Sequence, residues 1–106
     1  MPTYLLEVSY SVEGTKGLLK EGGSSRRETI TKMIEHLGGK VEAFYYTFGE
    51  DDCYVITELP DETAAAAVSL NVGASGAASI TTKVLIAPEV IDAASKTDIG
   101  YRAPGK

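Results

Sequence analysis

The sequence of 106 residues has no tryptophan, a single cysteine (Cys53) and a single histidine (His36). One cysteine excludes an intrachain disulfide and the paired-cysteine spacings that hold structural zinc. One histidine leaves few ways to build a metal centre, so we predict no metal and no cofactor. A chain of this length buries roughly two-thirds of its surface on folding. Side-chain packing alone is therefore expected to hold the fold.

Long apolar runs and clustered positive charge are also absent. No stretch approaches the roughly 18 uncharged apolar residues of a membrane-spanning helix. Residues 1–7 lack the basic region and apolar run of a secretory signal. The net charge of −5 disfavours binding to the phosphates of nucleic acid. These absences predict a cytoplasmic protein without a membrane or nucleic acid partner.

The sequence does contain alternating strand-like and helix-like segments. Residues 11–24, which include several glycines, are predicted to form a loop with at most one helical turn near 16–19. Ser25 is the predicted N-cap of the next helix, with Glu28 at the capping-box spacing. The patterns predict strands at 4–10, 41–48, 53–58 and 78–86, and helices at 26–37, 62–72 and 88–94.

This β-α-β-β-α-β order is typical of an α+β, ferredoxin-like sandwich with a four-stranded antiparallel sheet. No linker or break in composition divides the chain. We predict one domain over residues 1–95, followed by an irregular C-terminal tail over residues 96–106.

Both helices of such a fold cover one face of the sheet and leave the other face open. Strict alternation assigns the helix-covered face to Leu6, Val8, Val41, Ala43, Tyr45, Val84 and Ile86. It assigns the open face to Leu5, Phe44, Tyr46, Phe48 and Leu85, mixed with Glu7, Ser9, Glu42 and Lys83. An exposed patch of aromatic side chains marks an interaction surface. We predict that a second copy covers it in a homodimer or larger homo-oligomer; the alternative is that the C-terminal helix or tail does so.

The hairpin segment Gly49-Glu50-Asp51-Asp52-Cys53-Tyr54-Val55-Ile56-Thr57-Glu58-Leu59-Pro60-Asp61 resembles the GYD-domain family of small bacterial and archaeal proteins. The opening residues 1–6, the run 37–45 and the Ala-rich second helix are similar to it too. The resemblance covers roughly residues 1–87. It implies a fold of the dimeric α+β barrel type, whose members include cofactor-free monooxygenases, isomerases, haem enzymes and binding proteins.

One position departs from the family pattern. The signature is of the type Gly-x-Tyr-Asp, which Gly49 and Asp52 match, whereas Asp51 stands in the place of the tyrosine. A role that requires this phenol is therefore not carried over to this chain. The family implies no single activity.

Tyrosines and two ionisable residues are the candidates for a site. Tyr10 and Tyr45, with Tyr4 and Tyr54, have the apolar ring and polar tip that suit a pocket between sheet and helices, or else belong to core and interface packing. His36 is a candidate general base, or else a helix-end residue favoured by the dipole. Asp52 is a second candidate base, or else a turn residue that bonds backbone amides across the sheet.

Two further motifs have a functional and a structural interpretation. The segment from Gly22 to Arg27 lies at a helix N-terminus, where free amides attract anions and Arg26 and Arg27 add charge, or it is simply a capped loop. The acidic turn from Glu50 to Asp52 offers oxygen ligands for a hard cation, or it serves the hairpin turn alone. Cys53, beside carboxylates, is read as a buried and unreactive strand residue.

Three functions remain open from the sequence. The leading hypothesis is a small oligomeric binding or accessory domain for an unidentified small molecule. The second is a cofactor-independent monooxygenase or isomerase for a small aromatic compound, with Tyr10, Tyr45, His36 and Asp52 in a helix–sheet pocket. The third is an anion or metabolite sensor that uses Arg26 and Arg27. Whether the protein is an enzyme is left undecided.

Overall fold

The computed structural model describes all of residues 1–106 and contains four strands and four helices. Their bounds are β1 (Thr3–Tyr10), α1 (Val12–Glu21), α2 (Gly23–His36), β2 (Lys40–Tyr46), β3 (Cys53–Glu58), α3 (Glu62–Ala74), β4 (Ala78–Leu85) and α4 (Pro88–Ser95). No helix is long and apolar enough to cross a membrane.

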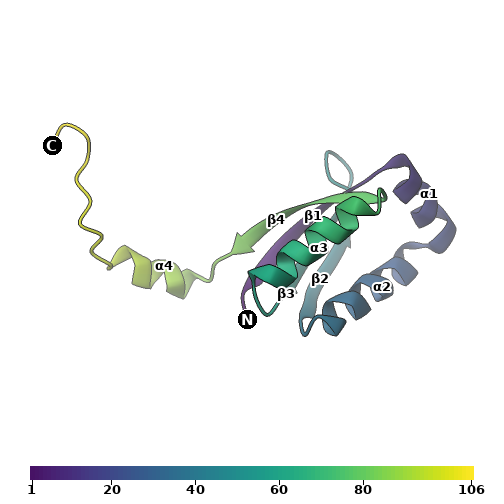
Figure 1. Cartoon of the computed structure of the whole chain (residues 1–106), viewed down its shortest axis with the longest axis horizontal. Helices are drawn as coiled ribbons and strands as arrows, with labels where there is room; N and C mark the ends of the chain where they lie inside the picture. Colours follow the sequence, from purple (N-terminus) through teal and green to yellow (C-terminus); the bar gives the residue numbers. More distant parts are fainter.

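The strands form one sheet in the order β2-β3-β1-β4, with every neighbouring pair antiparallel. Helices α2 and α3 lie over the same face of this sheet, and the other face carries no helix (Figure 1). This arrangement confirms the predicted α+β, ferredoxin-like fold.

The core lies between the two central strands and the helices α2 and α3. Its fully buried apolar members are Tyr4, Leu6, Ile34, Cys53, Val55, Leu59, Ala65 and Val68. Helix α3 begins as predicted, because the Asp61 side chain accepts a hydrogen bond from the Ala64 amide at 2.9 Å. Ala65 and Val68 then recur at the i, i+3 spacing, which turns one side of α3 toward the sheet.

The segment predicted as a glycine-rich loop is instead helix α1, which runs for ten residues. Ser11 caps it by accepting a hydrogen bond from the Gly14 amide at 3.1 Å. Gly14 and Gly17 lower the helix propensity, which favoured a loop. Tertiary contact overrides that propensity, because α1 packs against α2 and β1.

The predicted N-cap of the following helix was also wrong. Helix α2 begins at Gly23, with Gly22 as its N-cap and no side-chain capping bond. Ser25 lies inside the helix, and its hydroxyl donates to Glu21 at 3.5 Å rather than capping. Gly22 has a φ of 90°, which lets it end α1 and begin α2 without an intervening loop.

A β-bulge in β2 corrects the predicted assignment of side chains to the two faces. Val41 pairs with Thr57 and Ala43 with Ile56, so Glu42 is an extra residue in β2. Past the bulge the alternation is inverted. Phe44 packs against the core, whereas Tyr45 lies on the open face with 71% of its surface exposed. Tyr46 also turns to the helix side, where its hydroxyl donates to the Gly23 carbonyl at 3.0 Å.

The C-terminal part of the chain extends away from the sheet and its helices. Residues 86–106, which we call the arm, comprise α4 and the segments that flank it, and they project past the end of β4 (Figure 1). The radius of gyration is 17.1 Å, whereas a compact chain of this length has about 13 Å. The arm accounts for this elongated shape.

Candidate functional site

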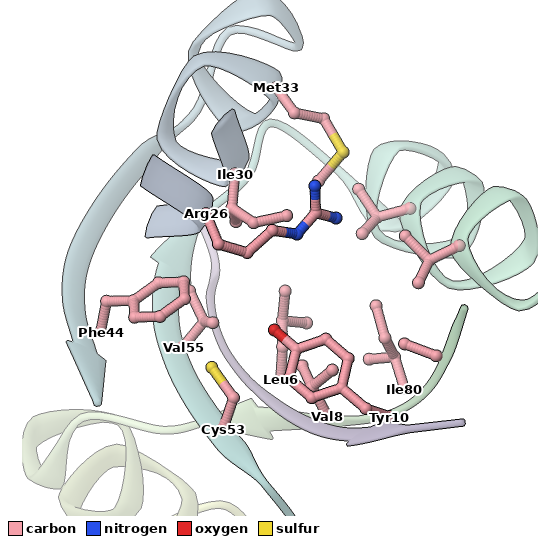
Figure 2. A pocket seen from close by; sticks show the side chains of 13 residues that line it. Leu6, Val8, Tyr10, Arg26, Ile30, Met33, Phe44, Cys53, Val55 and Ile80 are labelled. Atoms are coloured by element: carbon pink, nitrogen blue, oxygen red, sulfur yellow. The ribbon is translucent and has the colours of Figure 1, made fainter. Parts of the chain in front are cut away.

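A narrow apolar cavity of about 30 Å³ lies between the sheet and the helices α2 and α3. That volume accommodates one or two water molecules or a small apolar group. Twelve of its lining residues are hydrophobic and one, Arg26, is charged. The lining comprises Leu6, Val8, Tyr10, Arg26, Ile30, Met33, Phe44, Cys53, Val55, Val68, Val72, Ala78 and Ile80 (Figure 2).

An open cleft of about 390 Å³ adjoins this cavity beneath α1. The residues that border both spaces are Tyr10, Arg26, Met33, Val72 and Ala78. The cleft is therefore the wide outer part of the site, and the cavity is its narrow inner end. Tyr10 and Arg26, which are the only phenol and the only guanidinium in the lining of the inner cavity, lie at the boundary between the two.

Helix α1 forms one wall of the cleft because it is tied to the start of β4. The Ser11 hydroxyl donates to the Gly76 carbonyl at 2.7 Å, and the Ser11 amide donates to the Ala77 carbonyl at 2.9 Å. A Cβ at Gly14 would overlap the Ala77 carbonyl oxygen. Glycine at this position is thus what allows α1 to approach so closely.

Arg26 reaches the cavity because it continues the apolar side of α2. It lies four residues before Ile30 and seven before Met33, a spacing that places all three side chains on one side of a helix. Figure 2 shows the guanidinium extending from α2 over the cavity. None of the three ion pairs of the protein includes Arg26. Its positive charge is half-buried and has no acidic partner.

The acidic residues of the cleft do not neutralise Arg26. Glu13 and Glu21 border the cleft on α1. Glu13 pairs with Lys16 at 3.7 Å, and Glu21 accepts the hydrogen bond of Ser25. Both carboxylates lie farther from the guanidinium than an ion pair allows.

Tyr10 is held at the boundary by its own backbone. The Asp52 carboxylate accepts a hydrogen bond from the Tyr10 amide at 2.8 Å, and the Asp52 amide donates to the Val8 carbonyl at 2.8 Å. The β2–β3 hairpin is thereby joined to the end of β1, and Figure 2 shows the Tyr10 hydroxyl pointing into the cavity. This confirms the interpretation of Asp52 as a residue that bonds backbone amides across the sheet.

The thiol and the two phenols near the cavity hold their protons at neutral pH. Burial, with the Asp52 carboxylate as the second cause, raises the pKa of Cys53 to about 11. Burial likewise raises the pKa of Tyr46 to about 12, with the neighbouring Tyr10 phenol as the next cause. Burial and the Cys53 thiol raise the pKa of Tyr10, against the opposing effect of Arg26. The phenols, the thiol and the guanidinium are thus hydrogen-bond donors.

His36 and Tyr45 lie outside the cavity. His36 is exposed at the last residue of α2, and Tyr45 is on the open face of the sheet as a result of the β-bulge. Of the predicted ligand-binding set, the structure brings together Tyr10 and Arg26, with Asp52 behind Tyr10. The four residues proposed for an oxygenase or isomerase do not converge on one point.

The other motifs do not form a second site around these residues. Arg27 is exposed and does not line the cavity that Arg26 lines, so the two arginines do not share this site. Asp51 accepts a hydrogen bond from the Ser9 hydroxyl at 3.1 Å, which is a turn-stabilising role. No group of three or more His, Cys, Asp and Glu side chains is placed to hold a metal ion.

Part of the cavity wall was not predicted from the sequence. Phe44 was assigned to the wrong face, and Cys53 was interpreted only as a buried strand residue. The sequence of α2 contains a pattern that could have identified Arg26 as a residue of the cavity wall. Arg26 stands in register with Ile30 and Met33, so a charged residue continues an otherwise apolar stripe. Such a break in an apolar stripe indicates a polar group directed into the interior.

Comparison with known proteins identifies one family. The sequence model of the GYD-domain family matches residues 4–94, which is nearly the whole chain. No curated protein and no solved structure matches it. The matched region runs from β1 to α4 and thus includes every strand and helix that lines the cavity. The chain belongs to the GYD-domain family.

Proposed function

We propose that this protein is a small-molecule-binding domain whose ligand combines an apolar body with a hydrogen-bond-accepting group, a carboxylate above all. The supporting observation is the pairing of an apolar cavity with Arg26, an unpaired cation at its mouth. Binding sites for small molecules are mostly apolar with a few convergent polar groups. Here the polar groups are donors, so they complement an acceptor.

The shape of the two spaces suggests how such a ligand lies. The cleft of about 390 Å³ is within the range of small-molecule sites, whereas the inner cavity of about 30 Å³ admits only a small apolar end. The carboxylate then lies at the boundary, within reach of Arg26 and Tyr10. Met33 borders both spaces, and its flexible thioether chain can adjust to the ligand.

The test uses 2-naphthoate as the probe and its uncharged amide, 2-naphthamide, as the comparison. Arg26→Gln should weaken the binding of 2-naphthoate by about tenfold or more, because a hydrogen bond to a charged group contributes about 1.5–3 kcal/mol. Binding of 2-naphthamide should change less. Isothermal titration calorimetry measures both affinities.

Arg27→Gln is the matched control, since it removes the same charge from the adjacent, exposed position of α2. Equal losses in the two variants would mean a general electrostatic effect rather than a site. Naphthoate binding that does not change in Arg26→Gln would overturn the proposal.

We also propose that the protein acts as a homodimer or larger homo-oligomer in which a second copy covers the open face of the sheet. That face, as the structure defines it, carries the apolar residues Leu5, Ala43, Tyr45, Tyr54, Ile56 and Leu85. Apolar and aromatic residues on a face without a helix indicate an interaction surface. Light scattering at several concentrations should give at least twice the mass of the chain, and a constant monomer mass would contradict this.

A cofactor-independent oxygenase or isomerase and an anion sensor have less support. The first requires His36 and Tyr45 in the cavity, and the second requires Arg26 and Arg27 side by side. Neither grouping is present among these side chains.

A further inference from the structure

The arm contains a regular helix, α4, that does not pack against the sheet or the other helices. Helix α4 starts with Pro88 in its first turn, a position that proline favours. Val90 and Ile91 of the helix are 56% and 54% exposed, and Ile99 farther along is 78% exposed. Helix α4 makes no substantial contact with another helix or strand. An eight-residue helix is marginal in isolation, so packing is expected to stabilise it.

One side of α4 is apolar and the other is acidic. At 100° per residue, Val90, Ile91 and Ala94 share one side, while Glu89 and Asp92 occupy the opposite side. The apolar side is the surface that a partner would cover. The acidic side would stay in water.

The exposed area shows how much surface is left to cover. The chain exposes 7385 Å², whereas a compact monomer of its mass exposes about 5,700 Å². The excess is about 1,700 Å² per chain, which is more than the roughly 800 Å² that each partner contributes to a standard interface. Two copies that each hid this excess would form an interface of the size found in obligate homodimers.

The link between β4 and α4 directs the arm away from its own sheet. Only Ile86 and Ala87 separate the two elements, and Ala87 is extended with φ −65° and ψ 146°. A residue before proline is restricted to such extended conformations, so Pro88 disfavours a sharp reversal at Ala87. Short, stiff links of this kind favour the exchange of an element between copies over folding back.

We infer that the arm of each chain packs on the open face of a second copy, with Val90 and Ile91 against Leu5 and Ile56. This assignment rests on the homo-oligomer proposed above and names the segment that forms its interface. In a dimer with two-fold symmetry, the arm of each copy covers the open face of the other. No arm and no open face is then left uncovered, so the assembly contains two chains.

The two central charges of the open face are already paired, so covering the face leaves neither of them without a partner. These charges, Glu7 and Lys83, pair with each other at 3.0 Å. The Glu7 carboxylate raises the pKa of Lys83 through that hydrogen bond, so Lys83 keeps its positive charge at neutral pH. Leu5 pairs directly with Ile56 across β1 and β3, and Ile56 with Ala43 across β3 and β2, which makes an apolar row for α4 to cross.

The first experiment compares the dimer dissociation constants of four chains by sedimentation. The full chain should dimerise, and a chain ending at Ala87 should dissociate at least tenfold more readily. The double variant Val90→Ser/Ile91→Ser should show a similar loss in a chain of full length. Glu89→Ser/Asp92→Ser, on the opposite side of α4, is the matched control and should dimerise normally.

The second experiment shows where the arm packs. A full chain with Ile91→Cys is mixed with a chain that ends at Ala87 and carries Thr81→Cys on the exposed open face. Oxidation should give a mixed disulfide whose mass identifies one chain of each kind. Cys53 is buried and protonated, so it does not interfere. Ser75→Cys, exposed at the end of α3, replaces Thr81→Cys in the control and should crosslink poorly.

The outcomes separate the two proposals. A truncated chain that dimerises as tightly as the full chain would overturn the role of the arm and leave the homodimer standing. A full chain that stays monomeric would remove both. A disulfide within a single chain carrying Thr81→Cys and Ile91→Cys would place the arm on its own sheet and refute the exchange.

Discussion

The two faces of the sheet are made by the same strands but differ in what covers them. On the covered face, helices α2 and α3 bury Leu6 to 2% exposure and Val55 to 2%. On the open face, Tyr45 is 71% exposed and Tyr54 is 38% exposed. Large apolar side chains therefore occur on both faces, and the helices decide which face is the core of the single chain.

A substitution on each face gives the largest contrast. Leu6→Ala should lower the free energy of unfolding by about 3 kcal/mol, because it leaves a cavity in the core. Leu5→Ala, one residue away on the open face, should lower it by less than about 1 kcal/mol in a monomeric sample. Chemical denaturation measures both. Equal losses would mean that the open face is packed within the single chain.

The fit of α1 on the covered side can be tested with its two glycines. Gly14→Ala should destabilise the fold by about 2–3 kcal/mol, since its Cβ would overlap the Ala77 carbonyl oxygen. Gly17→Ala on the same helix meets open space and should stabilise it by up to about 1 kcal/mol. Thermal unfolding compares the two. A Gly14→Ala variant with unchanged stability would show that α1 is loosely held and the cleft has no fixed wall.

The raised pKa of Cys53, which lies on the covered face, predicts that the fold loses stability at alkaline pH. The pKa of Cys53 is raised to about 11 from an ordinary value of 9.0, so the folded state holds this proton more tightly than the unfolded state. The resulting stability is fully present below pH 9 and is lost as the pH rises through 11. At pH 11 the loss is on the order of 2 kcal/mol.

Cys53→Ala is the control for this effect. Its free energy of unfolding should fall less steeply between pH 9 and 11, under reducing conditions, than that of the unmodified protein. Both proteins retain Tyr10 and Tyr46, whose pKa values are raised mainly by burial and less by the thiol, so most of the slope from the tyrosines is common to the two proteins. Parallel curves for the two proteins would show that the thiol is not desolvated in the cavity.

Strong local signals predicted most of the elements. Asp61 with Glu62 marked the start of α3, and Pro88 marked the start of α4 within one turn. The hairpin strand β3 has the bounds 53–58 that alternation and turn residues predicted. Each of these depends on residues within a few positions of one another, so the sequence carries the information directly.

Two features depend on distant contacts and were therefore mispredicted. Helix α1 contains glycines whose local effect opposes a helix, and its close approach to Ala77 explains Gly14 only in three dimensions. The β-bulge at Glu42 arises from pairing with β3, and it exchanged the faces of Phe44 and Tyr45. One extra residue inverts every side chain beyond it.

The residues proposed for the candidate site also fall into two groups, those that the structure places at the cavity and those that it places elsewhere. Tyr10 and Arg26 were recognised from residue type and position, and the structure brings both to the cavity. Tyr45 and His36 were named for the same reasons and lie elsewhere. Residue type predicts what a side chain can do, whereas the bulge and the end of α2 determined where these two side chains lie.

By itself, the sequence determined the order of the four strands and of α2, α3 and α4, the antiparallel fold and the family, because these follow from short-range patterns and from a family match over residues 4–94. Only the tertiary structure decided which face each aromatic occupies, that an unpaired arginine closes an apolar cavity, and that the arm stands clear of its own sheet. These depend on pairing register and helix approach, which arise between residues far apart in the chain.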